Sequence, residues 1–339
     1  MKISEDYTRH GFKHTLLPSS FEEVTMPSIL GDSDNIYHYT SVSGLESILK
    51  NKKLWFTNIR YLNDRNEVNV GIEHLARITS NLFSEMDEGS DYSEFVNNDA
   101  EKLKLQDFQT YICCFSIGKD ELSLWNYYTK NVNSHGYNIG FNYKHLIYNL
   151  LKKNPELENC TITFGLIDYC INNQIHNKNA NPSYIDTMGE GLIKVWESIK
   201  NPDLNINYDE LDNNIKVLRY DGPNRIFRTC HLPELVYFLK RDYFYAEKEF
   251  RIVICVPNDT IEKFINEQQA KYKFRNQNGV LTPYLELDFD ASSIIGITSA
   301  PTNNGELLDK SIIDFCKACS INIDDLPEGI SHSNIPLRF

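Results

Sequence analysis

Residues 244–254, FYAEKEFRIVI, set three charged side chains at the start of an apolar run that is typical of a buried strand. Successive side chains of a strand point to opposite faces, so we expect Glu247, Glu249 and Arg251 to share one face with Val253. Two interpretations follow. The charged residues form either an Arg–Glu pair at a solvated strand end or a catalytic carboxylate pair, because carboxylates are seldom buried unless they are paired or functional.

The rest of the chain predicts an α+β fold. Strand-like runs are short and do not alternate strictly with helices, which argues against a doubly wound parallel sheet. Twenty tyrosines and 18 phenylalanines in 339 residues also favour a sheet-rich core. We expect strands at 36–40, 54–57, 109–117, 137–141, 160–169, 243–256, 284–289, 293–298 and 335–339. We expect helices at 44–50, 64–82, 122–128, 143–152, 260–271 and 307–318.

The domain organisation predicted from these elements is simple. Residues 1–34 read as an N-terminal arm, and residues 326–339 as a C-terminal tail. Between them, residues 35–325 form a single domain with a mostly helical insertion around 150–240.

The charge and the apolar runs of the sequence limit which binding partners and which cellular compartment we expect for the protein. The net charge of −13 disfavours sequence-independent binding to nucleic acid, although residues 219–251 hold seven Lys or Arg against five acids and could rim a groove. The sequence starts without the apolar segment of a signal peptide, and no run approaches eighteen apolar residues. We therefore expect a cytoplasmic protein with reduced thiols and no membrane association. The single C-x-x-C pair, Cys316 and Cys319, lacks a second pair, so no metal site is predicted.

Three further clusters are candidates for binding. Tyr37–Ser41 lie where a strand passes into a helix, a junction that presents free backbone N–H groups to ligands. Asn63 and Asp64 lie in a turn that enters the next helix, where Asp64 also fits a structural helix cap. The third cluster follows the strand that ends near Ser116, and its aromatic residues could stack on a flat heterocycle or simply fill the core: Trp125, Tyr127 and Tyr128.

Taken together, the motifs YHYTS, GLESIL, LWFTN, YLNDRNE, CCFS, LSLWNYY, GYNIGF, YAEKEFRIVI and IIGITSAP resemble a bacterial family catalogued as domain of unknown function 2971, over residues 36 to about 320. The stretch YHYTSVSGLESILKNKKLW is also similar to the opening of DarT-type DNA ADP-ribosyltransferases. The E-x-E of residues 247–249 is similar to the catalytic strand of arginine-type ADP-ribosyltransferases. That superfamily carries a His-Tyr-Glu or Arg-Ser-Glu triad on a split, mixed or antiparallel sheet with peripheral helices.

The resemblance implies an NAD-dependent ADP-ribosyltransferase that acts as a bacterial toxin or phage-defence effector. His38 would be the first-strand histidine, Ser116 or an aromatic residue of 125–128 the middle element, and Glu249, or else Glu247, the glutamate. Cleavage of the nicotinamide–ribose bond passes through an oxocarbenium-like transition state. A carboxylate beside the ribose, Glu249, would stabilise this positive charge. Glu247 would orient or deprotonate the acceptor nucleophile.

The resemblance implies that NAD is the substrate and that no metal is required. The other site residues would bind NAD. His38 would hold the adenosine-side ribose, and Thr40 or Ser41 the nicotinamide end. Arg251 would keep Glu249 ionised or reach a phosphate. Other expected contacts come from Tyr39, Asn63, Asp64, Trp125, Tyr127 and Tyr128. The acceptor would be a nucleic acid or a protein, and an antitoxin or defence-system protein is a possible partner. The alternatives are an NAD glycohydrolase and a non-catalytic module that binds a nucleotide or a partner.

Overall fold

The computed structural model describes most of the expected domain. The residues described are 14–16, 33–62, 108–129, 136–157, 160–171, 174–175, 221–222, 225–226, 236–266, 271–277, 279–301 and 306–336. Asn63, Asp64, the expected helix at 64–82 and most of the expected insertion lie outside them.

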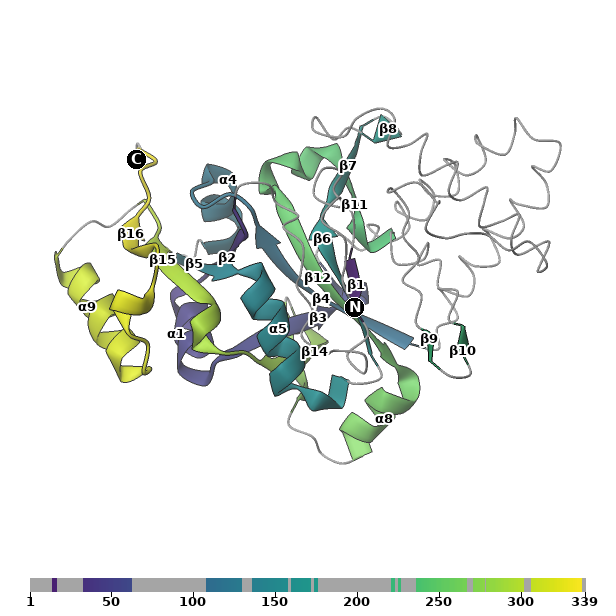
Figure 1. Cartoon of the computed structure of the whole chain (residues 1–339). Coiled ribbons are helices and arrows are strands. Elements are labelled where there is room, and N and C mark those ends of the chain that lie inside the picture. Colours follow the sequence, from purple (N-terminus) through teal and green to yellow (C-terminus); the bar gives the residue numbers. More distant parts are fainter. Residues whose placement is uncertain are drawn as a thin grey trace.

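An 11-stranded sheet organises the described residues (Figure 1). One path through it runs β1-β6-β12-β4-β2-β5-β15-β16, and β3, β14 and β13 branch from β4. The strands are β1 His14–Leu16, β2 Asn35–Thr40, β3 Lys53–Asn58, β4 Phe108–Ser116, β5 Tyr137–Asn142, β6 Thr161–Leu166, β12 Glu249–Pro257, β13 Tyr272–Gln277, β14 Val280–Asp288, β15 Ile294–Ser299 and β16 Gly329–His332. Neighbouring strands are antiparallel except β15 and β16.

The sheet splits along β4, which is the feature that creates the site. One edge of β4 pairs with β12 along its whole length. On the other edge, Ser116 pairs with Tyr37 of β2, whereas Ile112 pairs with Thr57 of β3. The strands β2 and β3 therefore diverge from β4 at residues 113–115, and we call this opening the fork.

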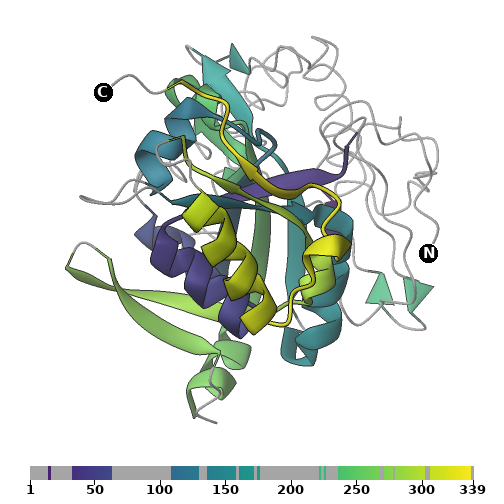
Figure 2. The same ribbon diagram turned by 90° about the vertical axis from the view of Figure 1, so that its left-hand side faces the viewer.

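Strand β12 is buried on both faces. Phe250, Ile252 and Ile254 belong to the main core, which is covered by α1 (Val42–Asn51), α5 (Tyr143–Lys153), α8 (Asn258–Asn266) and α9 (Glu306–Ala318). Figure 1 shows α5 in front of the sheet, and Figure 2 shows α9 beside α1. On the opposite face, Val253 and Cys255 pack in a second core with Tyr169, Tyr237 and Phe238. The alternation expected from the sequence is confirmed.

The second core is closed by a small sheet of three strands, β7 (Asp168–Ile171), β8 (Gln174–Ile175) and β11 (Leu239–Arg241). Helices gather on one face of the main sheet and strand segments on the other, so the expected α+β class is confirmed. After the end of α5, the described residues in the range of the expected insertion form strands and short 3₁₀ turns. Most of that range lies outside the described residues, so its helical character stays a prediction.

Three other boundaries differ from expectation. Strand β12 starts at Glu249, because residues 242–247 form a 3₁₀ turn that ends at Lys248 in the left-handed conformation (φ 46°). Helix α8 ends at Asn266 and is followed by β13, which had not been expected. The final described strand is β16, which pairs with β15 and takes part of the expected C-terminal tail into the sheet. No helix among the described residues has the length and apolar character needed to span a membrane.

The main core predicts a large effect of truncating Phe250. Its ring is fully buried, with centroids 5.5 Å from Tyr143 and 6.4 Å from Phe164. Phe250→Ala leaves a cavity and should reduce the free energy of unfolding by about 3–5 kcal/mol. Urea denaturation measures this change. The control is Tyr127→Ala, because Tyr127 is 80% exposed, and it should shift stability by less than about 0.5 kcal/mol. Equal effects of the two substitutions would contradict the assignment of the core.

Candidate functional site

A pocket of about 570 Å³ opens at the fork. Its volume falls in the range of small-molecule sites. Both glutamates of the E-x-E motif line it, together with the expected residues Tyr39, Thr40, Ser41, His38, Ser116 and Tyr128. Trp55, Thr57, Arg275 and Gln277 also line it, and none of them is among the site residues predicted from the sequence, although Trp55 and Thr57 lie in the motif LWFTN.

Glu249 is a buried carboxylate that accepts hydrogen bonds from charged donors on both oxygens. Arg251 donates to it twice, from Nε to Oε1 (2.6 Å) and from Nη2 to Oε2 (3.1 Å), and Lys240 donates to Oε2 (2.9 Å). Burial alone would raise the pKa of Glu249, but Arg251 and Lys240 outweigh it and lower the pKa to about 2. Glu249 is therefore ionised at neutral pH. Since only 4% of Glu249 and 1% of Arg251 are exposed, the interpretation of a solvated strand end is wrong.

Glu247 lines the same pocket as Glu249 but comes from a different structural element. It lies in the 3₁₀ turn, so the expectation that it shares a strand face with Glu249 is wrong. The left-handed Lys248 turns the chain between the two glutamates. Lys240 then joins the carboxylates, because its Nζ also donates to Glu247 Oε2 (2.6 Å), and Tyr128 donates to Glu247 Oε1 (2.7 Å).

Lys240 is a part of the site that sequence reasoning missed. It is buried at the end of the apolar run LVYFL and lies over the Phe244 ring at 4.6 Å from the centroid. A lone lysine that ends such a run, a few residues before two glutamates, was the available signal. With Arg251 it balances the charges of Glu247 and Glu249, which meets the requirement that buried charges be paired.

His38 borders the fork directly. Its Nδ1 lies 3.0 Å from the carbonyl oxygen of Cys114, one of the β4 residues left between β2 and β3. A carbonyl only accepts hydrogen bonds, so Nδ1 carries the proton and Nε2 is an acceptor. Burial lowers the pKa of His38, which keeps this neutral form at neutral pH.

Ser116 ties the glutamates to β4. It lies opposite Glu249 in the β12–β4 register, and its hydroxyl donates to the carbonyl oxygen of Glu247 (2.7 Å). The same hydroxyl accepts a hydrogen bond from the N–H of Gly118 (3.0 Å). Ser116 therefore fixes the turn that carries Glu247, while it also lines the pocket.

The aromatic residues expected to stack on the ligand divide into two groups. Tyr128, a residue that is 45% exposed, lines the pocket, and burial of its hydroxyl together with the Glu247 carboxylate raises the pKa of that hydroxyl. Trp125 does not line the pocket, because it packs edge-on against Tyr39 at 4.7 Å and donates to Asp120. Tyr127 points away as an exposed side chain. Stacking by Trp125 or Tyr127 is therefore not supported by their positions.

Three other residues expected to bind the ligand make hydrogen bonds within the protein. Ser41 caps α1 by accepting from the N–H of Gly44 (3.1 Å), which sets the start of this helix at the pocket wall. Tyr39 donates to the carbonyl oxygen of Gly118 (2.9 Å). Arg251 does not line the pocket and also donates from Nη1 to the carbonyl oxygen of Tyr237 (2.7 Å), so its position fits the support of Glu249 and not a phosphate contact.

The strand order sets the distance between the two ends of the expected triad. Tyr37, Ser116 and Glu249 lie opposite one another on β2, β4 and β12. Two strand spacings therefore separate the backbones of His38 and Glu249, about 10 Å. One dinucleotide is long enough to contact both residues.

Cysteine nucleophiles are disfavoured in this pocket. Cys113 and Cys114 line it as free thiols. Burial raises the pKa of Cys113 to about 12, and burial together with the Glu249 carboxylate raises that of Cys114 well above its usual value. Both remain thiols at neutral pH, whereas the thiolate is the nucleophilic form. Among the described residues, no group of three or more His, Cys, Asp or Glu side chains is arranged to hold a metal ion.

The local basic excess is largely used internally where the structure describes it. Lys240 and Arg251 pair with the glutamates, and Lys248 pairs with Glu121 (2.6 Å). These three cations do not provide a free basic rim for nucleic acid.

Comparison of the chain with protein-family models, curated proteins and solved structures finds no match. The resemblance to domain of unknown function 2971 and to ADP-ribosyltransferases stays a prediction from the motifs.

The lysine bridge predicts a pH-dependent loss of stability in Lys240→Met. The substitution leaves Glu247 and Glu249 facing each other with one cation fewer, so it should destabilise the fold at pH 7 by about 3 kcal/mol. In the wild type, ionised Glu249 stabilises fully above the unfolded pKa of about 4.3 and less as the pH falls toward 2. The deficit of the variant should therefore stay constant from pH 7 to about pH 4.5 and shrink as the pH falls from there toward 2, as measured by urea denaturation.

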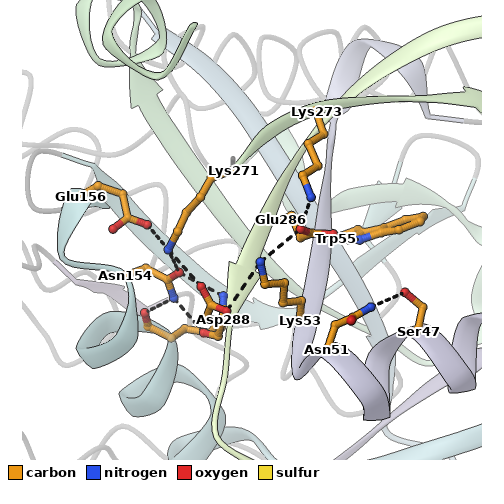
Figure 3. Close-up of polar contacts among 11 residues, drawn as sticks. Ser47, Asn51, Lys53, Trp55, Asn154, Glu156, Lys271, Lys273, Glu286 and Asp288 are labelled. Carbon is orange, nitrogen blue, oxygen red and sulfur yellow. Dashed lines mark hydrogen bonds and ion pairs between the residues drawn. The ribbon is translucent and has the colours of Figure 1, made fainter. Parts of the chain in front are cut away.

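The control for this experiment is Lys273→Met. Figure 3 shows Lys53, Lys273 and Trp55 around the buried Glu286. Because Lys53 and Trp55 remain bonded to Glu286 after the substitution, the loss should be under about 1 kcal/mol. A Lys240→Met deficit that does not change with pH would contradict a bridge between two carboxylates.

Proposed function

We propose that this protein is an NAD-dependent ADP-ribosyltransferase that acts as a bacterial toxin or defence effector in the cytoplasm. The observation that carries the proposal is that His38, Tyr128, Glu247 and Glu249 line one pocket at the split of the sheet. His38 comes from β2, Tyr128 from the π-helical turn Trp125–Thr129, Glu247 from the 3₁₀ turn before β12 and Glu249 from the start of β12. A split sheet with a histidine, a tyrosine and a glutamate is what the resemblance implied.

Glu249 would stabilise the positive charge that develops on the ribose when nicotinamide leaves. It is ionised, held rigidly by Arg251 and excluded from bulk water, which strengthens its effect on a nearby charge. Arg251 and Lys240 use three of its roughly four acceptor positions. The Cys114 thiol also donates a weak hydrogen bond to this carboxylate, and a ribose hydroxyl would replace that thiol as the donor.

His38 and Tyr128 would hold the rest of NAD. Neutral His38 offers Nε2 as an acceptor for a hydroxyl of the adenosine-side ribose. The half-exposed ring of Tyr128 offers a flat surface for nicotinamide, and its hydroxyl fixes Glu247. Glu247 is the less buried of the two carboxylates, with 12% of its side chain exposed against 5%, which suits contact with an acceptor nucleophile.

Glu249→Gln tests the proposal. The substitution removes the charge beside the ribose and should lower NAD consumption by at least a hundredfold, measured as nicotinamide release by the purified protein in the presence of cell lysate. Glu286→Gln is the matched control, because Glu286 is also buried (7% exposed) and bonded by lysines but lies outside the pocket. It should retain turnover.

The outcomes separate the candidate functions. Melting curves of both variants show whether a loss of turnover reflects unfolding. Unchanged NAD loss in a folded Glu249→Gln variant would remove Glu249 from the mechanism. Absence of turnover in the wild type with nucleic-acid and protein acceptors present would favour a non-catalytic binding module. Turnover that yields only free ADP-ribose would favour an NAD glycohydrolase.

Glu247→Gln should separate transfer from bond cleavage. If Glu247 acts on the acceptor, the variant loses labelling of the acceptor by about tenfold or more, while release of nicotinamide falls less. Incubation with radiolabelled NAD and cell lysate measures both quantities in one sample. Equal losses of labelling and release would place Glu247 with Glu249 in bond cleavage.

A further inference from the structure

Arg275 of β13 is a cation without a carboxylate partner among the described residues. Its Nη2 donates to Thr57 Oγ1 (2.9 Å) and to Gln277 Oε1 (3.3 Å). Its guanidinium lies 5.4 Å from the centroid of the Trp55 ring and 5.9 Å from that of Tyr284. Its Nε is buried without a hydrogen-bond partner. A desolvated guanidinium with an unsatisfied N–H is costly, so this arrangement favours a bound anion.

The pocket therefore has two ends of opposite charge. Arg275 lines one end, and Glu247 and Glu249 line the other. The start of α1 also lines the wall, with Ser41 and Gly44, and a helix N-terminus adds a positive potential. The α1 wall and Arg275 are independent features that favour the same sign of ligand charge.

The sheet register gives the separation of the two ends. Glu249 lies opposite Ser116, and Thr57, the hydrogen-bond partner of Arg275, lies opposite Ile112. Four residue steps along β4, about 13 Å, separate these two positions along the strand, and two strand spacings separate Glu249 from Thr57 across it. A single sugar is too short to contact both ends. A ligand that uses the whole pocket has a ribose near the carboxylates and an anionic group some way along its length.

We propose that Arg275, seated against Trp55 and Thr57, binds the diphosphate of a nucleotide whose ribose faces Glu249. The planar guanidinium matches two phosphate oxygens in a bidentate contact, and it remains charged when it is partly buried. This inference rests on the proposed function for the identity of the nucleotide. The phosphate contact itself is open to measurement without any turnover.

A phosphate at this end has two possible sources, the dinucleotide or a nucleic-acid acceptor. The dinucleotide is favoured, because Arg275 lines the same pocket as His38 and Glu249, so one extended ligand in this pocket can contact all three residues. An oligonucleotide included in the experiment distinguishes the second source.

Calorimetric titration of the purified full chain with ADP-ribose, adenosine and a 5′-phosphorylated single-stranded oligonucleotide tests the proposal. ADP-ribose should bind at least tenfold more tightly than adenosine. Arg275→Gln should weaken ADP-ribose binding by about tenfold to a hundredfold and leave adenosine binding unchanged. Arg241→Gln is the matched control, because Arg241 is exposed and does not line the pocket, and it should bind as the wild type does. Arg275→Lys should recover part of the loss.

A second measurement avoids dependence on the folding of the variant. Inorganic pyrophosphate, added to the wild type, should compete with ADP-ribose and not with adenosine. Equal weakening of ADP-ribose and adenosine by Arg275→Gln, or no competition by pyrophosphate, would overturn the proposal. Dependence on Arg275 seen with the oligonucleotide alone would also overturn it. If ADP-ribose binding depends on Arg275 but NAD is never consumed, the phosphate site stands and the proposed function fails.

Discussion

The central constraint in this structure is the neutralisation of two carboxylates inside a protein core. Glu249 stands at the start of a strand that is buried on both faces, where an unpaired charge would be untenable. Arg251 follows on the same face, and Lys240 arrives from a different strand. Because Lys240 also binds Glu247, this ion pair joins the turn before β12 to the small sheet that carries Lys240. The Ser116 hydroxyl joins the same turn to the end of β4 through the carbonyl oxygen of Glu247.

The fork in the sheet makes this charged network accessible. A continuous sheet would satisfy every edge group of β4 with a neighbouring strand. Here β2 and β3 diverge from it, and the side chain of His38 takes the carbonyl oxygen of Cys114 instead. The divergence leaves space beside Glu249 without exposing the core. The ionised carboxylate is thus presented to a ligand in surroundings that exclude most of the water.

Local sequence patterns predicted most of the longer strands and the two faces of β12, because these depend on the period of apolar residues. The motifs also pointed to His38, Ser116, Tyr128 and Glu249. The pairing of Lys240 with both glutamates could not be predicted, since nothing near Lys240 in the sequence specifies which strand it will lie beside. The same holds for Arg275, which reaches the pocket across β14 from a hairpin that was not expected.

The β4–β12 pairing joins residues that are far apart in the chain, with Ser116 opposite Glu249 and Phe108 opposite Pro257. Long-range pairing of this kind closes a large loop before it gains stability, so it slows folding. The same pairing also determines when the pocket can form while the chain is being synthesised. The pocket wall that carries Glu249 cannot form until the ribosome has released the chain beyond residue 257, and Arg275 follows still later. A truncated or newly emerging chain therefore holds His38 and β4 without the opposing carboxylates, and the site assembles only after the segment from β12 to β13 has been synthesised.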